Sequence, residues 1–363
     1  PGGGQRHHTD IAGQIQADGV GARGLQADLP AAKAGQLGVG RVSALDGEGD
    51  GAVCVEQVGI VIDDAVKPQV VDGAVDVQKP QIGPALVQRN RAQLFPDEVF
   101  TNSGLTGRQM QAKAKNMLYD WFVTFRKEGF TEWNSSPYLP IDTLGFGSLY
   151  AFAQDPAMRE LGREGMDFAY YLLAVHSQQG IFASSSGRTY IKEQFGNWSN
   201  CPSGLSWIGY GYGVPGHAGK GITSYCLSDY EPPKEFAQWF SIPRGKEMIC
   251  QTTQGNDGYV DLYTYKTADY MMTSANDFHP GEPGHQENPF QLTFNAVAQL
   301  WVTHPGERVL FGAARPSYWA GNGTLPKVNQ YKAFAGLIYA LAPEHPVDFT
   351  HLYLPSMEFD RCE

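Results

Sequence analysis

Residues 1–94 lack aromatic side chains altogether. No Phe, Tyr or Trp precedes Phe95, and the first methionine is Met110. A segment composed mainly of Gly, Ala, Val, Asp and Gln has too few large side chains to bury a stable core of its own. Three interpretations of residues 1–94 stay open: a disordered or loosely packed tail, a small β domain built on alternating valines, or a stretch translated in the wrong reading frame and joined to a genuine domain.

Other absences narrow the classes of function. The formal net charge of −11 argues against nucleic acid as a partner. No run of about 18 apolar residues occurs, so we expect no membrane span. The first residues are not followed by an apolar segment, and no signal peptide is visible. The five cysteines contain no C-x-x-C pair, which argues against a zinc knuckle. We expect no cofactor and no catalytic metal, and leave a structural metal open.

Helical periodicity begins after this first segment. Apolar residues at three- and four-residue spacing predict a helix from Gly107 to Gly129. A second helix is expected from Ile141 to Gln154. Asp155-Pro156 then supplies an N-cap followed by proline at the first helical position, and the third helix is expected to run to about Gln178.

The pattern changes after Gly180. Residues 181–258 are rich in Gly, Tyr and Trp without helical periodicity, and we interpret them as a loop region. From Tyr259 alternation predicts an antiparallel β domain over 259–363. Helices followed by strands indicate a multidomain α+β protein, with residues 95–180 as the helical part. The further strand candidates are Pro289–Val302, Arg308–Ala313, Tyr331–Leu341 and Val347–Leu354.

Polar residues gather on the loop between the first two helices. Glu132, Asn134 and Tyr138 lie on it, and Asp142 opens the next helix. A carboxylate can act as a general acid or base, and an amide can bind a substrate carboxylate. The alternative is a turn and capping cluster, because Asn and Ser favour turns.

A second polar stretch, Ser184-Ser-Ser-Gly-Arg-Thr-Tyr190, follows the third helix. Arg188 could bind a carboxylate or sulfate as a bidentate fork. Tyr190 could transfer a proton if the arginine lowered its pKa. A turn with a solvated arginine is the alternative. Because two antiparallel helices return the chain to one end, we expect Asn134 and Arg188 to line one cleft, with Glu132 orienting Arg188 or a histidine.

Further candidates are scattered along the chain. His176, near the end of the third helix, either faces the site or stabilises the helix terminus. His285 and Gln286 lie in a tight loop that could contact substrate or form a structural turn, and its spacing fits no metal-site template. Tyr318 and Trp319 could stack on sugar rings or fill the β domain.

From about Phe95 onward the chain resembles the heparinase II/III-like polysaccharide lyases. The resemblance rests on the order of helices and strands, on 134–138, on Gly187-Arg-Thr-Tyr190 and on Arg315-Pro-Ser-Tyr-Trp-Ala-Gly-Asn-Gly. It implies a partial α/α toroid followed by an antiparallel β-sandwich-like region. The chain departs from the family because only three clear helices are predicted before the strands. The missing ones would fall in residues 1–94, as in a truncated or misframed chain.

The resemblance also implies roles for residues. In such lyases an Asn, with or without an Arg, neutralises the uronate carboxylate, while Tyr and His take and return the proton. Asn134 and Arg188 match the first role by type. Those that match the second are Tyr190 or Tyr138, and His176 or His285.

We therefore expect a lyase that cleaves a uronic-acid-containing polysaccharide by β-elimination. An acidic polysaccharide or oligosaccharide would be its partner, and a secreted or periplasmic location would follow. One alternative is a glycoside hydrolase that uses Glu132 and Asp142. Another is a non-catalytic protein that binds sugar through Tyr318 and Trp319.

Overall fold

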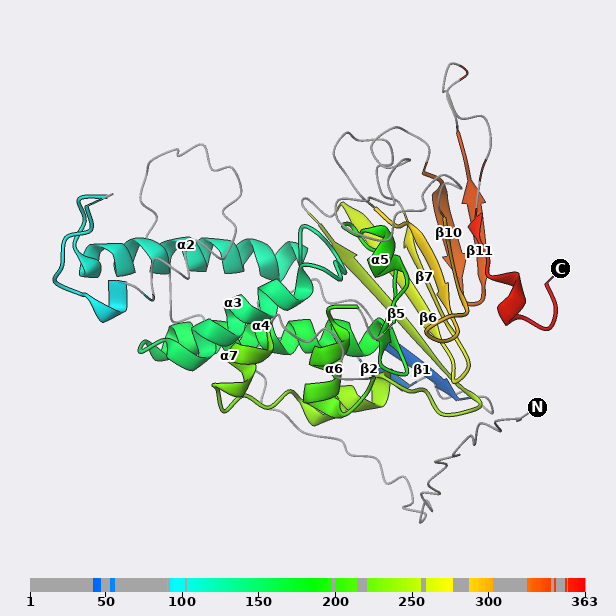
Figure 1. The fold of residues 1–363 in the computed structure, drawn as a ribbon, viewed down its shortest axis with the longest axis horizontal. Coiled ribbons are helices and arrows are strands. Elements are labelled where there is room, and N and C mark those ends of the chain that lie inside the picture. The colour runs from blue at the N-terminus through cyan, green and yellow to red at the C-terminus, as the bar shows by residue number, and fades with distance from the viewer. Residues whose placement is uncertain are drawn as a thin grey trace, which may run out of the picture.

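The structure of the chain is a computed structural model. It describes the backbone of residues 42–46 and 53–55, and residues 90, 92–101, 103–197, 200–213, 221–255, 259–276, 287–302, 325–340, 343, 350 and 352–362. Helices α2 to α4 lie at one end and a large, mostly antiparallel sheet at the other (Figure 1). The α+β class predicted from the order of patterns is confirmed.

The first predicted helix is confirmed as α2 (Gly107–Glu128). Thr106 and Gln109 form a capping box at its start, in which each side chain accepts from the other's backbone N–H. Gly129 ends the helix with a φ of 64°, a conformation that glycine adopts without strain. The buried side chains of α2 include Met110, Ala114, Leu118, Phe122 and Phe125, and the last three belong to the core shared with the other helices.

The next two helices are α3 (Leu139–Phe152) and α4 (Pro156–Val175), which pack against each other. Asp155 caps α4 by accepting from the backbone N–H of Ala157 at 3.0 Å. Gly165 permits the close approach, because a Cβ there would lie 2.3 Å from the Phe146 ring. Helix α4 ends before the predicted Gln178, since residues 177–178 turn into a short strand.

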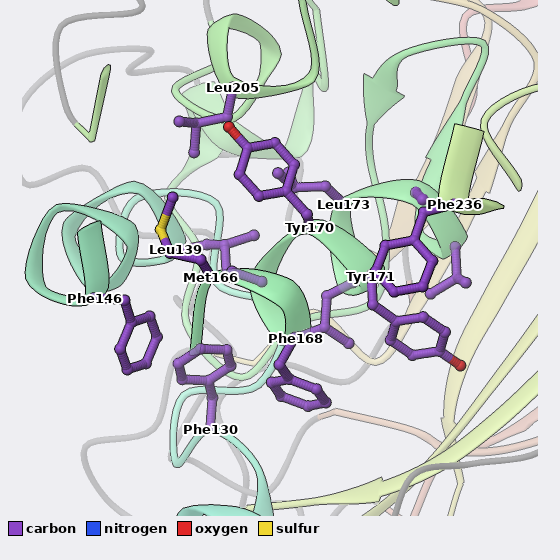
Figure 2. Close-up of a cluster of buried hydrophobic side chains, with 14 of the residues drawn as sticks. Phe130, Leu139, Phe146, Met166, Phe168, Tyr170, Tyr171, Leu173, Leu205 and Phe236 are labelled. Atoms are coloured by element: carbon purple, nitrogen blue, oxygen red, sulfur yellow. The ribbon is translucent and has the colours of Figure 1, made fainter. Parts of the chain in front are cut away.

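An aromatic core joins the helical layer to the sheet (Figure 2). The Phe130 ring lies 6.2 Å from that of Phe146 and 5.7 Å from that of Phe168, centroid to centroid. Met248 and Cys250 of the sheet belong to the same buried cluster. Burial of each such large side chain stabilises the fold by about 1.5–3 kcal/mol. The two layers therefore share one core.

Short elements fill the region that the sequence pattern predicts as loop. Each helix has eight residues or fewer, too short for apolar periodicity to be visible. The short elements are the hairpin of β3 (Ser177–Gln178) and β4 (Ile181–Phe182), the helices α5 (Ile191–Gln194), α6 (Ser203–Tyr210) and α7 (Ile222–Cys226), and the 3-10 helix η1 (Lys234–Trp239).

The main sheet is an antiparallel meander from β5 to β9, extended at one edge by β12. Its strands are β5 (Lys246–Gln254), β6 (Val260–Lys266), β7 (Met271–Asn276), β8 (Phe290–Thr293), β9 (Gln299–Val302) and β12 (Leu352–Tyr353). The sequence pattern did not predict β5, and the strand expected over Pro289–Val302 is divided into β8 and β9. The candidate Arg308–Ala313 lies outside the described residues.

Two hairpins extend this sheet. β10 (Lys327–Tyr331) and β11 (Phe334–Ile338) branch from β7 through one parallel contact, Val328 to Asn276. β1 (Val42–Asp46) pairs antiparallel with β5 and with β2 (Val53–Val55). The 3-10 helix η2 (Ser356–Glu358) follows β12. The three interpretations of residues 1–94 stay open, since most of that segment lies outside the described part of the chain.

Candidate functional site

Two loops that are far apart in the sequence meet in the fold. We name residues 130–138, between α2 and α3, loop A, and residues 183–190, between β4 and α5, loop B. The backbone N–H of Gly187 donates to the carbonyl of Trp133 at 2.8 Å. The Ser135 hydroxyl donates to the carbonyl of Arg188 at 2.9 Å, and Asn134 Nδ2 donates to that of Ser185 at 3.4 Å. The two predicted polar stretches therefore lie side by side.

Local backbone chemistry permits this junction. Asn134 has a φ of 48°, in the left-handed region that Asn tolerates better than most residues. Gly187 lies directly against the Trp133 indole, and a Cβ at this position would be 2.6 Å from Nε1. Only glycine fits there without displacing the ring.

Arg188 is the central cation of the junction. Its Nε and Nη2 both lie 2.8 Å from Glu132 Oε1, and its Cζ lies 5.5 Å from the Tyr138 ring centroid. Desolvation lowers the pKa of Arg188, but the hydrogen bond to Glu132 and its charge outweigh this, and the net pKa is raised. The side chains of Arg188 and Glu132 keep 25% and 33% exposure, so this ion pair is partly exposed to solvent.

Two tyrosines flank this ion pair. Desolvation and then the charge of Glu132 raise the pKa of Tyr138, while Arg188 opposes the shift. The Tyr190 hydroxyl is near enough to raise the pKa of Tyr138 further, by its charge and a hydrogen bond. Tyr138 therefore stays protonated at neutral pH and can donate a proton.

Asp142, in the first turn of α3, is a second carboxyl group near the junction. It keeps some exposure but is closely surrounded by protein. Desolvation, followed by the charge of Glu132, raises the pKa of Asp142 to about 8. Asp142 is therefore a neutral acid at pH 7, while Glu132 is ion-paired.

Asn134 lies beneath the surface of the junction. Its exposure is 2%, and its amide donates to the Ser185 carbonyl. In this position Asn134 ties loop A to loop B, and Arg188 is the more accessible group for a substrate carboxylate.

His176 lies in the interior between α4 and β6. Its exposure is 1%, and its Nδ1 is 3.0 Å from the Thr264 hydroxyl. Burial, helped by the charge of Lys266, lowers the pKa of His176 to about 3, so its ring is neutral. A polymer in solvent does not reach a ring in this position, which fits the structural alternative for His176.

The remaining predicted residues, His285, Gln286, Tyr318 and Trp319, lie outside the described residues. Sequence reasoning missed Trp133 and Ser135, which join the loops, and Asn288, whose backbone pairs with Ser186 at 2.7 and 2.9 Å. It also missed the buried Lys266. The one feature of the sequence that could have indicated a buried lysine is its place at the end of the alternating pattern of β6.

The described part of the chain holds no group of three or more His, Cys, Asp or Glu side chains able to bind a metal ion. None of its helices combines the length and the apolar character needed to cross a membrane.

Comparison of the chain with protein-family models, with curated proteins and with solved structures found no match. The chemistry of the junction between loops A and B is therefore the feature of the molecule that bears on its function.

Proposed function

We propose that this protein is a polysaccharide lyase that cleaves a uronic-acid-containing polysaccharide by β-elimination. The observation that carries the proposal is the partly exposed Arg188 guanidinium, held by Glu132 beside Tyr138 and Tyr190. A fixed cation next to two hydroxyl groups matches the needs of a substrate that carries a carboxylate beside an acidic C–H.

The reaction needs charge neutralisation before proton transfer. Arg188 binds the uronate carboxylate, which makes the proton on the adjacent carbon more acidic. Tyr190, reacting as its phenolate, accepts that proton and becomes a neutral phenol, while a C=C bond forms and the C–O bond to the leaving sugar breaks. Tyr138, which is protonated at neutral pH, returns a proton to the leaving oxygen. Glu132 orients Arg188, and Asn134 holds loop B in place.

The proposed activity also implies a more specific fold. Helices α2 to α4 would be part of an α/α toroid, and the strands a sandwich-like region. The order of helices before strands and the packing of α3 on α4 support it. An acidic polysaccharide as partner and a secreted or periplasmic location follow from the substrate class.

The test is turnover of a panel of acidic polysaccharides, because lyase products carry a new double bond that absorbs in the ultraviolet. Tyr190→Phe should abolish turnover and leave polymer binding nearly unchanged. Tyr331→Phe, on an exposed tyrosine of β10, is the matched control and should keep full activity. Wild-type protein that produces no absorbing product from any uronate polymer would refute the proposal, as would an active Tyr190→Phe variant.

A glycoside hydrolase is the second candidate, favoured by one observation. Asp142, with its pKa raised to about 8, and the ion-paired Glu132 form a neutral acid and an anionic carboxylate. Two carboxyl groups in opposite protonation states are what general-acid hydrolysis of a glycoside needs. A hydrolase would release reducing ends without ultraviolet absorbance and would lose activity in Asp142→Asn. A lyase would keep it.

A further inference from the structure

Loop B is attached to the sheet by buried amide and hydroxyl side chains, which we name the amide ladder. Its members lie on β7, β8 and β9, apart from Asn288, which lies two residues before β8. Each of them is at most 1% exposed. They are Thr273, Asn288, Gln291, Thr293 and Gln299.

The ladder holds the flank of loop B that precedes Arg188. The Thr273 hydroxyl accepts from the backbone N–H of Ser185 at 2.8 Å. Thr293 Oγ1 donates to the carbonyl of Ala183 at 3.2 Å, and Asn288 Nδ2 lies 3.4 Å from that of Ser184. Residues 183–185 therefore take their position from side chains of the sheet.

The ladder also holds the chain that follows Tyr190. Gln291 Nε2 donates to the carbonyl of Gln194 at 2.7 Å, and Gln299 Nε2 donates to that of Gly196 at 3.1 Å. Gln291 Oε1 in turn accepts from Asn288 Nδ2 at 2.6 Å. The Gln291 amide thus connects the two flanks between which Arg188 and Tyr190 lie.

Hydrogen bonds at this depth select one arrangement of the loop. Apolar packing is non-directional, whereas a buried amide that loses its partner costs the full desolvation of that group. Proton transfer requires heavy-atom distances of about 2.6–3.2 Å and is therefore sensitive to small displacements of a tyrosine hydroxyl. Ionic attraction to a guanidinium falls off more gradually with distance.

We propose that Gln291 is a positioning residue, which sets the place of Arg188 and Tyr190 by fixing both flanks of loop B to β8. The catalytic consequence rests on the proposed function, while the structural consequence does not. Without the Gln291 amide, loop B and the residues after it lose their shared anchor, and the turn at 187–190 moves away from Glu132 and Tyr138.

The experiment compares Gln291→Met with Gln330→Met by hydrogen exchange of the backbone amides and by steady-state kinetics. Gln330 is a suitable control because it is also a buried amide of the sheet, donating to the carbonyls of Met272 and Lys332 at 3.1 and 3.0 Å. Gln291→Met should speed exchange over residues 183–196 by about tenfold, with β6 unchanged. Gln330→Met should leave residues 183–196 as in the wild type.

Kinetics separate positioning from general destabilisation. In Gln291→Met we expect kcat to fall about tenfold and KM to change by less than about twofold, because Arg188 keeps its charge while the tyrosine moves. Thr293→Val removes only the bond to Ala183 and should give a smaller, local rise in exchange. It is the substitute variant for the exchange experiment if Gln291→Met does not fold.

The outcomes are distinguishable. Exchange that rises equally over β6 and residues 183–196 in both Gln291→Met and Thr293→Val would overturn the positioning role. So would unchanged exchange over 183–196. A local rise in exchange combined with a wild type that turns over no polysaccharide would support the positioning role and count against the proposed lyase.

Discussion

Replacement of the buried Lys266 by methionine should destabilise the whole fold. Lys266 extends from β6, has no exposed surface, and its Nζ donates to three backbone carbonyls. They are those of Ala174 at 3.0 Å, Ser177 at 2.5 Å and Trp239 at 2.7 Å. One side chain therefore ties the end of α4, the start of β3 and η1 to the sheet.

The expected loss follows from these contacts. Each hydrogen bond to a charged donor contributes about 1.5–3 kcal/mol. Desolvation of the ammonium, which lowers the pKa of Lys266 to about 7, offsets part of this sum. Methionine keeps most of the volume but leaves three carbonyls without a donor. We expect Lys266→Met to lower the free energy of unfolding by about 3 kcal/mol, because each buried carbonyl that is left without a donor costs about 1–3 kcal/mol and relief of the ammonium desolvation offsets part of that cost.

The assay is guanidinium unfolding followed by tryptophan fluorescence, with Lys332→Met as the control. Lys332 Nζ lies 2.9 Å from Glu247 Oε2, and its side chain is 34% exposed. A pair this exposed contributes less than about 1 kcal/mol. Equal losses in the two variants would refute the reasoning. A stabilised Lys266→Met would also refute it, by showing that desolvation of the ammonium outweighs its three bonds.

Three further predictions concern the junction and its surroundings. Gly187→Ala places a Cβ 2.6 Å from Trp133 Nε1 and should cost about 1–3 kcal/mol in urea unfolding. Gly336→Ala, whose Cβ would lie 4.0 Å from Phe334 Cε1, an ordinary van der Waals contact, should be neutral. Because the native pKa of Asp142 is raised to about 8, the native state binds more protons than the unfolded one between about pH 4 and 8, and stability falls as pH rises through that window. Asp142→Asn should flatten this slope and melt at a higher temperature than wild type at pH 8; an unchanged slope would mean that Asp142 is ionised in the fold. Because the native pKa of His176 is lowered to about 3, the unfolded state binds more protons between about pH 3 and 6.5, and stability falls on acidification. His176→Asn should weaken that acid sensitivity in thermal melts at pH 7, 5 and 4; an equal fall in both proteins would contradict a buried neutral ring.

The helices were predictable because their causes are local. Periodic apolar residues and Gly129 mark α2, and Asp155-Pro156 marks the start of α4, all within a few residues of the feature that they specify. The start of α3 was missed by two residues, because Tyr138 supplies no side-chain cap that a sequence pattern could reveal. β5 was missed because it follows a long stretch of short helices and turns.

The sequence by itself determined the α+β order and the two polar stretches around Asn134 and Arg188. Only the tertiary structure decided that Arg188 binds Glu132, that Asn134 and His176 are buried, and that the amide ladder supports loop B. The reason is the range of the interactions. Capping and periodicity act over a few residues, whereas Lys266 reaches a carbonyl 92 positions away. A polar side chain becomes a structural anchor or a reactive group according to the partners that packing of distant segments brings to it.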